Sequence, residues 1–275
     1  MKHTFQSSKY VLKNFFFLLP FTVIPAFFFS LSTDEKALFL VIDKLINGRT
    51  NEWCFTHLFR TLSFLNFVSF KSILFGMLGI IAITVCGALL MAFLEKHLRI
   101  GKRTYNGIIS RLNDNLTSTI MYVAVLIVIY ELWALVTAEL LFLVSRIANP
   151  AFLYTLLAVV TLAMHAVLVW LVGFIYLWLP CMQITGFRAL EAIVYVNRIS
   201  STHSKLKIFS SQMFVLLLAE FIISACGYLL ANNFLLFTIV TTVAFAVMIM
   251  IYCVRMEIAY FHVDHLERAD IKRYY

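Results

Sequence analysis

Residues 151–179 read AFLYTLLAVVTLAMHAVLVWLVGFIYLWL and contain no Asp, Glu, Lys or Arg. An α-helix needs about 20 mostly apolar residues to cross a hydrocarbon core about 30 Å thick. This run is longer than that, so it predicts a membrane-spanning helix that is tilted or projects from the bilayer.

The composition of the whole chain agrees with this prediction. Hydrophobic residues make up 62% of the 275 residues and charged residues 13%, whereas a soluble domain has about 45–50% and about 25%. A soluble fold of this length has too little interior for so much apolar surface, but a bilayer solvates it. We therefore expect one all-α integral membrane bundle of about six transmembrane helices over residues 1–275. Further apolar spans are expected at about 14–31, 72–94, 117–144, 210–230 and 235–254.

The first span also fits a secretory signal peptide. Basic residues precede it, and Ser30-Leu31-Ser32 resembles a small-residue cleavage site. Its apolar stretch exceeds the about 7–15 residues usual for a signal peptide. We favour an uncleaved helix, kinked at Pro20 and Pro25.

Basic residues predict the orientation of the chain. Sixteen of the 22 Lys and Arg residues fall before the first span, in 95–116, in 181–208 or in the tail, and six fall in the alternate segments. The positive-inside rule places the first set in the cytoplasm, so both termini are expected there, in a plasma-membrane protein. The net charge of +8 then indicates attraction to anionic lipid of the cytoplasmic leaflet. Nucleic acid is not expected as a partner.

Three segments between the spans predict helices at the membrane surface. Residues 32–71 indicate two short outer helices separated near Gly48, the first starting with Ser32 and Glu35 at capping-box spacing. Apolar stripes predict amphipathic interfacial helices at Tyr105–Leu116 and at 186–199. Lipid headgroups are expected to contact Lys102, Arg103 and Arg111.

The sequence also suggests a parallel internal repeat, with halves at 72–144 and 151–230. Ile100-Gly101-Lys102-Arg103 is similar to Thr185-Gly186-Phe187-Arg188, and the following span of each half carries one acidic residue in an apolar run. If the repeat is real, the halves are two copies of helix, surface helix, helix, related by an axis along the membrane normal.

A family resemblance rests on Leu179-Pro180 followed by Gly186-Phe187-Arg188-Ala189-Leu190-Glu191-Ala192-Ile193. This stretch, with basic residues leading into a new span, resembles the multi-pass domains fused to some bacterial glycerophosphodiester phosphodiesterases. The same group includes uncharacterised membrane proteins in which the multi-pass domain stands alone. The resemblance covers about residues 72–254 and implies a six-helix bundle without assigned catalysis.

Ionisable residues within the spans are the candidates for a polar site. A carboxylate in hydrocarbon is costly, so Glu131, Glu139 and Glu220 should face the bundle interior and pair, carry a proton or line a polar cavity. His165 lies near the middle of its span and is expected to pair with Glu131 or Glu220, or to be a buried imidazole with one hydrogen bond. The alternative for each carboxyl is a purely structural hydrogen bond to a neighbouring helix.

Metal, cofactor and disulfide chemistry is not expected. The five cysteines lack metal-ligand spacing, and His262 and His265 fall short of the three or four ligands of a zinc site. GxxxxGK[ST], HExxH and GxSxG motifs are missing, which removes a built-in ATPase and the commonest zinc-protease and serine-hydrolase signatures.

Two functions from different classes remain open. The first is a membrane protein that moves, or helps to move, a solute or lipid without its own ATPase, for which Glu131, His165 and Glu220 should converge on a cavity. The second is a non-catalytic accessory or scaffold subunit of a larger complex, with a membrane-protein partner or a second copy against a face of small residues. An embedded enzyme ranks third, since no nucleophile stands out. We do not expect an enzyme.

Overall fold

The computed structural model describes residues 2–66, 69–200, 202–230 and 233–272, which form helices and no strand. Six of these helices are long and apolar enough to span a membrane. The predicted class, an all-α bundle of about six spanning helices, is therefore confirmed, and the protein is a multi-pass membrane protein. The spans are α1 (Lys2–Ser32), α4 (Phe70–Ile100), α5 (Leu112–Val144), α6 (Pro150–Ile175) continued by α7 (Trp178–Thr185), α9 (Thr202–Leu229) and α10 (Phe234–Val263).

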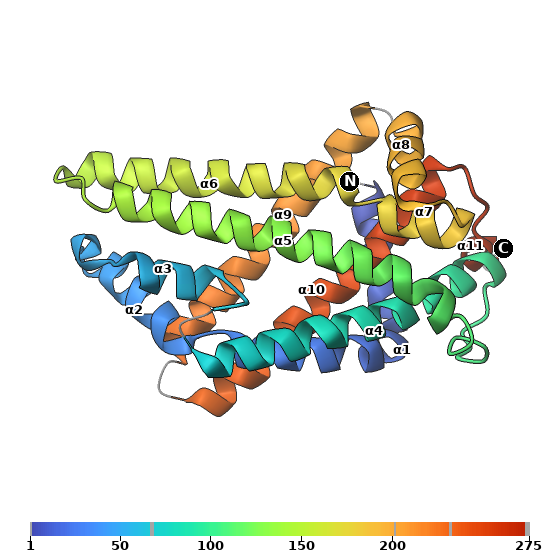
Figure 1. Ribbon diagram of the computed structural model, residues 1–275, viewed down its shortest axis with the longest axis horizontal. Helices are drawn as coiled ribbons and strands as arrows, with labels where there is room; N and C mark the ends of the chain where they lie inside the picture. Colours follow the sequence, from blue (N-terminus) through green and yellow to red (C-terminus); the bar gives the residue numbers. More distant parts are fainter. Residues whose placement is uncertain (1, 67–68, 201, 231–232, 273–275) are drawn as a thin grey trace.

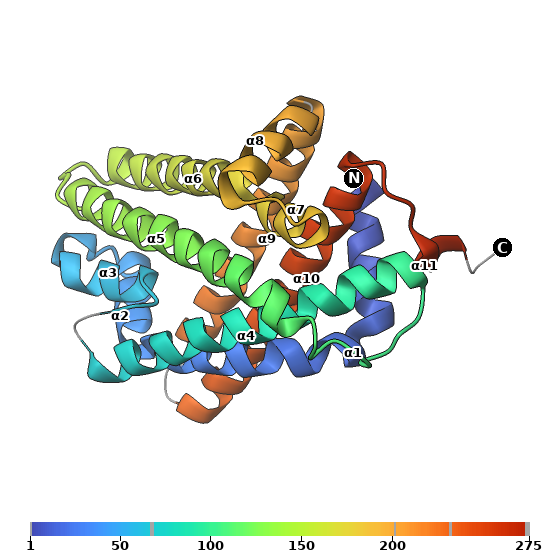
Figure 2. The same cartoon turned by 45° about the vertical axis from the view of Figure 1, so that its right-hand side comes forward.

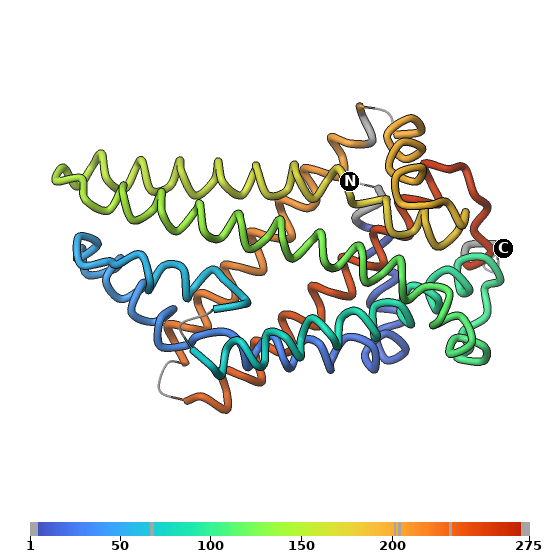
Figure 3. Tube along the Cα trace, viewed as in Figure 1, coloured from blue at the N-terminus to red at the C-terminus, as the bar shows by residue number. Residues whose placement is uncertain are grey.

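The spans are arranged as two helix pairs with two helices crossing between them. Figure 1 shows α5 beside α6 and α1 beside α4, with α9 and α10 running diagonally between the pairs. The second view agrees (Figure 2), and the tube in Figure 3 follows the same course. Helix α10 contacts α1, α4, α7 and α9, so it is the central element of the bundle.

The short helices expected in residues 32–71 are present. They are α2 (Glu35–Ile46) and α3 (Phe55–Leu62), joined by the 3-10 turn η1 (Thr50–Glu52). Gly48 lies between them with φ +68°, a conformation that favours glycine. The cap differs from the expected box, because Asp34 is the N-cap and its side chain accepts the Ala37 N–H.

The expected amphipathic helix at Tyr105–Leu116 is wrong. Residues 101–111 form coil and turns, and α5 begins only at Leu112. Two adjacent residues of the predicted stripe lie in different environments, because Ile108 is buried in the core and Ile109 is exposed. The segment forms a turn that packs against α1 instead of a helix. The Tyr105 hydroxyl holds it there by donating to the Phe17 carbonyl of α1.

The second surface helix does form, as α8 (Ala189–Ile199). The two aligned glycines of the suggested repeat are also alike, because Gly101 and Gly186 both end a helix in the left-handed conformation. Their surroundings differ, since a turn follows Gly101 and a helix follows Gly186. The pattern of helix, surface helix, helix is therefore complete only in the second half.

The small residues of α4 pack within this chain. A methyl group on Gly76 would lie 2.5 Å from the Phe64 carbonyl oxygen, and one on Gly79 would lie 2.9 Å from the Phe29 ring. Such close approach is the way small residues join helices in lipid. This face of α4 is therefore occupied by the chain's own α1 and its α3–α4 connection.

Segments predicted to be cytoplasmic share one end of the bundle. In Figure 1 the α4–α5 turn, α7, α8 and the short C-terminal helix α11 (Ala269–Lys272) lie on the right, and the α5–α6 connection lies on the far left. The counting of basic residues thus grouped these segments correctly. We call this the basic end of the bundle.

Candidate functional site

Glu131 is anchored to the connection between α3 and α4. Its carboxylate accepts the Ser63 hydroxyl at 2.5 Å and the backbone N–H groups of Phe64 and Leu65, both at 3.0 Å. Three donors satisfy a carboxylate that would otherwise be costly within a span. The connection packs here because Gly76 of α4 leaves room for the Phe64 carbonyl.

Two aromatic residues beside Glu131 extend the network. The Tyr130 hydroxyl donates to the Leu62 carbonyl at 2.7 Å, and its ring stacks on Phe64 with centroids 4.7 Å apart. One helical turn from Tyr130, the Trp133 indole N–H donates to the Met164 carbonyl at 2.7 Å. The α5 face that holds α3 is thereby joined to α6.

His165 and Glu220 form a pair between α6 and α9. The Nε2 atom of His165 lies 2.5 Å from Oε2 of Glu220, and its Nδ1 atom lies 2.6 Å from the Thr161 carbonyl oxygen. Trp133 meets the imidazole edge to face, with centroids 5.2 Å apart. Of the two partners expected for His165, the structure brings Glu220 to it, whereas Glu131 binds elsewhere.

Hydrogen-bond chemistry restricts where protons can lie in this pair. A carbonyl oxygen only accepts, so Nδ1 of His165 carries a hydrogen. The contact between Nε2 and Oε2 then holds one further proton, either as imidazolium with carboxylate or as imidazole with carboxylic acid. With that proton the pair is neutral, and without it the pair carries one negative charge.

The pair is far from both ends of its helices. Nine residues separate Glu220 from Leu229, the nearer end of its span, which corresponds to about 14 Å. The His165 side chain is 3% exposed and the Glu220 side chain 35% exposed. A glutamate stem is too short to reach a surface from this depth, so the exposed edge of Glu220 opens at membrane depth.

The remaining candidate residues do not join this network. Glu139 is exposed and makes no hydrogen bond or ion pair that the described residues reveal. Arg111 binds the buried Glu95 at 2.9 Å, so its guanidinium is engaged within the chain. Lys102 and Arg103 are exposed, with the Arg103 guanidinium 5.6 Å from the centre of the Phe17 ring.

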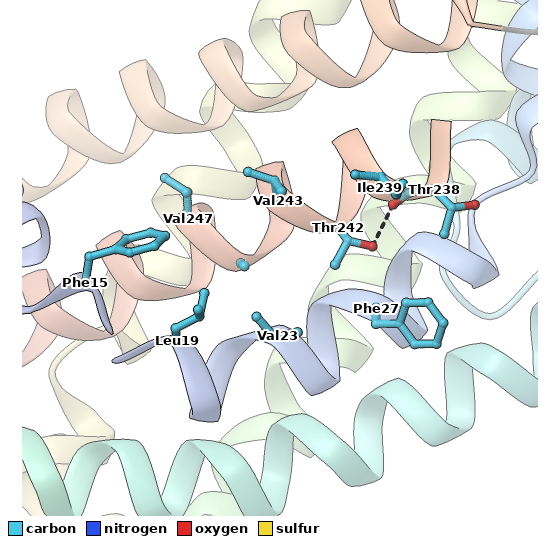
Figure 4. A pocket seen from close by; sticks show the side chains of 10 residues that line it. Phe15, Leu19, Val23, Phe27, Thr238, Ile239, Thr242, Val243 and Val247 are labelled. Carbon is cyan, nitrogen blue, oxygen red and sulfur yellow. Dashed lines mark hydrogen bonds between the residues drawn. The ribbon is translucent and has the colours of Figure 1, made fainter. Parts of the chain in front are cut away.

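A hollow of about 250 Å³ lies between α1 and α10, away from the candidate residues (Figure 4). Its two threonine hydroxyls donate to carbonyls of their own helix, Thr238 to Phe234 and Thr242 to Thr238. It therefore presents hydrocarbon, and it is not the polar cavity expected around Glu131, His165 and Glu220. The lining residues are Phe15, Leu19, Val23, Phe27, Thr238, Ile239, Thr242, Val243, Ala246 and Val247.

Comparisons of this chain with protein-family models, with curated proteins and with solved structures find no match. The resemblance carried by residues 179–193 accordingly stays a prediction.

The sequence did not single out a second set of ionisable residues at the basic end. These residues are Glu95, Arg255 and Glu257, and all three are buried. In the sequence they stand at the edges of apolar runs, where a charged side chain is expected to reach water. Arg255 was counted with the cytoplasmic tail, whereas α10 continues to Val263 and encloses it. Apolar residues follow Arg255 at helical spacing, and this pattern predicts that the helix continues beyond it.

Proposed function

We propose that this membrane protein moves, or helps to move, a solute or lipid, and that the His165–Glu220 pair is its working polar site. The pair lies at membrane depth and differs by one unit of charge between its two protonation states. Ionisable residues that face the interior of a bundle within spans mark ion, proton or substrate pathways. The observation that carries the proposal is the 2.5 Å contact between two titratable groups, one of them 35% exposed.

Glu131 has a different role in this proposal. Its three hydrogen bonds hold the α3–α4 connection, so it positions structure and takes no part in movement. Tyr130 lies within electrostatic range of both Glu131 and Glu220.

The test uses purified protein in liposomes that contain a pH-sensitive dye and a fluorescent phospholipid. Proton flux under an imposed membrane potential and phospholipid exchange between leaflets are both measured. We expect the parent to exceed empty liposomes in at least one assay, and Glu220→Gln to return that assay to the empty level. Glu139→Gln, the matched control at an exposed carboxyl, should behave as the parent does. A parent that equals empty liposomes in both assays contradicts the proposal.

The accessory or scaffold function has one observation in its favour. Only 11% of the most apolar stretch of α9 is buried within the chain, the lowest share among the six spans. A partner helix would cover that surface. At Gly76 and Gly79 the small-residue face of α4 is filled by this chain, so that part of it is not open to a partner.

A photocrosslinker at Phe221 distinguishes these two functions. Phe221 is 72% exposed on α9, one residue after Glu220. Crosslinks in native membranes to a protein, or to a second copy of this chain, support the accessory function. Crosslinks to lipid alone contradict it.

The location that goes with this function is the plasma membrane, with the basic end in the cytoplasm. Support comes from the excess of basic residues in the segments that meet at that end. Lys102 and Arg103 are exposed there, available to anionic headgroups of the cytoplasmic leaflet.

A further inference from the structure

Buried polar side chains without a hydrogen-bond partner gather at the basic end of the bundle. Native proteins leave few such groups unpaired, so a concentration of them requires a physical explanation. They come from α1, α5, α9 and α10. The atoms are Asn14 Oδ1, Asn115 Nδ2, both ends of the Gln212 amide, Arg255 Nη2 and both carboxyl oxygens of Glu257.

Arg255 is the most informative member of this group. Arg255 is only 6% exposed. Its Nη1 atom donates to the Ser211 carbonyl at 3.2 Å, whereas its Nη2 atom has no hydrogen-bond partner among the described residues. Within the described part of the chain, no carboxylate forms an ion pair with it. The hydroxyls of Tyr176 and Tyr252 are within electrostatic range of it.

An arginine cannot escape this situation by losing its proton. A buried charge without a counter-ion is strongly unfavourable, and buried charges in proteins are paired or bind a ligand. Glu257 does not serve, because its electrostatic partners are Glu95 and Arg99. The described residues therefore supply no counter-ion to Arg255, and an anion from outside the chain would satisfy its charge.

The neighbouring donors define what kind of anion fits. Gln212 follows Ser211 directly, and its amide lies beside the Tyr176 hydroxyl, which donates its own hydrogen to the Tyr252 carbonyl at 3.3 Å. Arg255 Nη2 and the Gln212 amide thus offer N–H groups at one place. Oxyanions with several acceptor oxygens, phosphate above all, match such a set.

We infer that Arg255 and Gln212 bind a phosphate group, either the headgroup of an anionic phospholipid or a soluble phosphate. Arg255 lies eight residues, about 12 Å along the helix, before the end of α10 at the basic end of the bundle. Exposed Lys205 and Lys207 precede Gln212 on α9 and attract anions to this edge. The site is independent of the His165–Glu220 pair and of the proposed movement of a solute or lipid.

Access to the guanidinium is through α9. Its first turns touch Arg255 through the Ser211 carbonyl, and α9 is the least buried of the spans. An outward shift of these turns uncovers Nη2, and the bound phosphate then occupies the place between α9 and α10. Binding should accordingly hold α9 in its shifted position.

The test is native mass spectrometry of the purified full-length protein in neutral detergent. Phosphatidylglycerol or inorganic phosphate is added, with chloride used to equalise ionic strength, and the adduct mass identifies the source. We expect one phosphate-bearing adduct per chain in the parent, and occupancy lower by roughly tenfold or more in Arg255→Met and Gln212→Leu. Arg198→Gln, an exposed arginine on α8, is the matched control and should bind as the parent does.

Thermal unfolding keeps the inference testable if a variant fails to fold. The parent should unfold at a higher temperature with whichever anion it binds, relative to chloride at equal ionic strength. Arg255→Met should show no such rise. A parent without an adduct or thermal shift for either anion, or an Arg255→Met that binds as well as the parent, overturns the inference.

Discussion

The carboxylate of Glu131 accepts the backbone N–H of Phe64 at 3.0 Å, which ties the middle of α5 to the connection between α3 and α4. Leu65 and Ser63 donate to the same carboxylate. A glutamate in a spanning helix thus accepts the backbone N–H groups of the α3–α4 connection, which have no partner in a helix. Glu131, which the sequence made a candidate for a transport site, instead anchors the connection that follows α3.

Glu131→Gln should destabilise the protein by about 1.5–3 kcal/mol, because an amide keeps one acceptor oxygen and turns its NH₂ group towards donors. Unfolding of purified protein in mixed micelles measures the change. Glu139→Gln is the control and should stay within about 0.5 kcal/mol of the parent, since Glu139 is exposed. Equal stability of the two variants would show that the anchor contributes nothing.

Gly76→Ala should destabilise the protein by about 1–3 kcal/mol, because the added methyl meets the Phe64 carbonyl oxygen. That carbonyl cannot easily move, since the N–H of the same peptide unit, from Leu65, donates to Glu131. The control is Gly173→Ala on α6, where no atom lies within 4 Å of the added methyl. That change should be neutral or slightly stabilising, since alanine favours helix. The same unfolding assay applies, and an alanine tolerated equally at both positions contradicts the packing described for α4.

His165 and Glu220 should be energetically coupled. A double-mutant cycle with His165→Asn and Glu220→Gln should give a coupling free energy of about 0.5–3 kcal/mol, because each substitution removes the same contact. The control cycle combines Glu220→Gln with Glu139→Gln, and its coupling free energy should be near zero. A coupling near zero between His165 and Glu220 would mean that the contact does not exist in the membrane.

Tyr195→Phe should loosen α8 from the end of α10, at a cost of at most about 1 kcal/mol for a partly exposed hydroxyl. The Tyr195 hydroxyl donates to Asp264 at 2.7 Å, and this hydrogen bond, with burial and the Asp264 charge, raises the pKa of the phenol. A raised pKa means that the protonated phenol stabilises the fold below its usual pKa of about 10. That stability is lost as the pH rises through the pKa of the folded protein.

The difference in stability between parent and Tyr195→Phe should therefore shrink at alkaline pH. Unfolding measured from neutral to alkaline pH tests this, with Tyr154→Phe as a control at an exposed tyrosine of α6. A difference that is constant with pH would contradict the role given to the hydrogen bond.

Cysteines introduced at Arg103 and His265 should resist an impermeant thiol reagent added outside intact cells. Arg103 belongs to the α4–α5 turn and His265 to the α10–α11 connection, and both segments lie at the basic end. A cysteine at Ala148, in the exposed α5–α6 connection at the far end, should react. The native Cys54, also in an outer segment, is replaced by serine in all variants. Strong outside labelling at 103 or 265 would reverse the orientation.

Apolar run length and the spacing of helical stripes were enough to predict the six spans, α2, α3 and α8. These features depend on residues near one another in sequence, where helix geometry fixes which side chains share a face. The prediction for Tyr105–Leu116 failed for the same reason. Its stripe is helical in period, but contacts of Tyr105 and Ile108 with distant parts of the chain stabilise a turn instead.

The sequence by itself determined that this chain crosses a membrane about six times, and which residues would be costly there, because hydrocarbon penalises charge wherever the helix lies. Only the tertiary structure decided the partners of those residues. Glu131 and Glu220 look alike in sequence, yet one binds a chain reversal and the other an imidazole from α6. Hydrogen bonds act over about 3 Å, so which groups meet depends on how helices cross, and helix crossing is set by packing across the whole bundle.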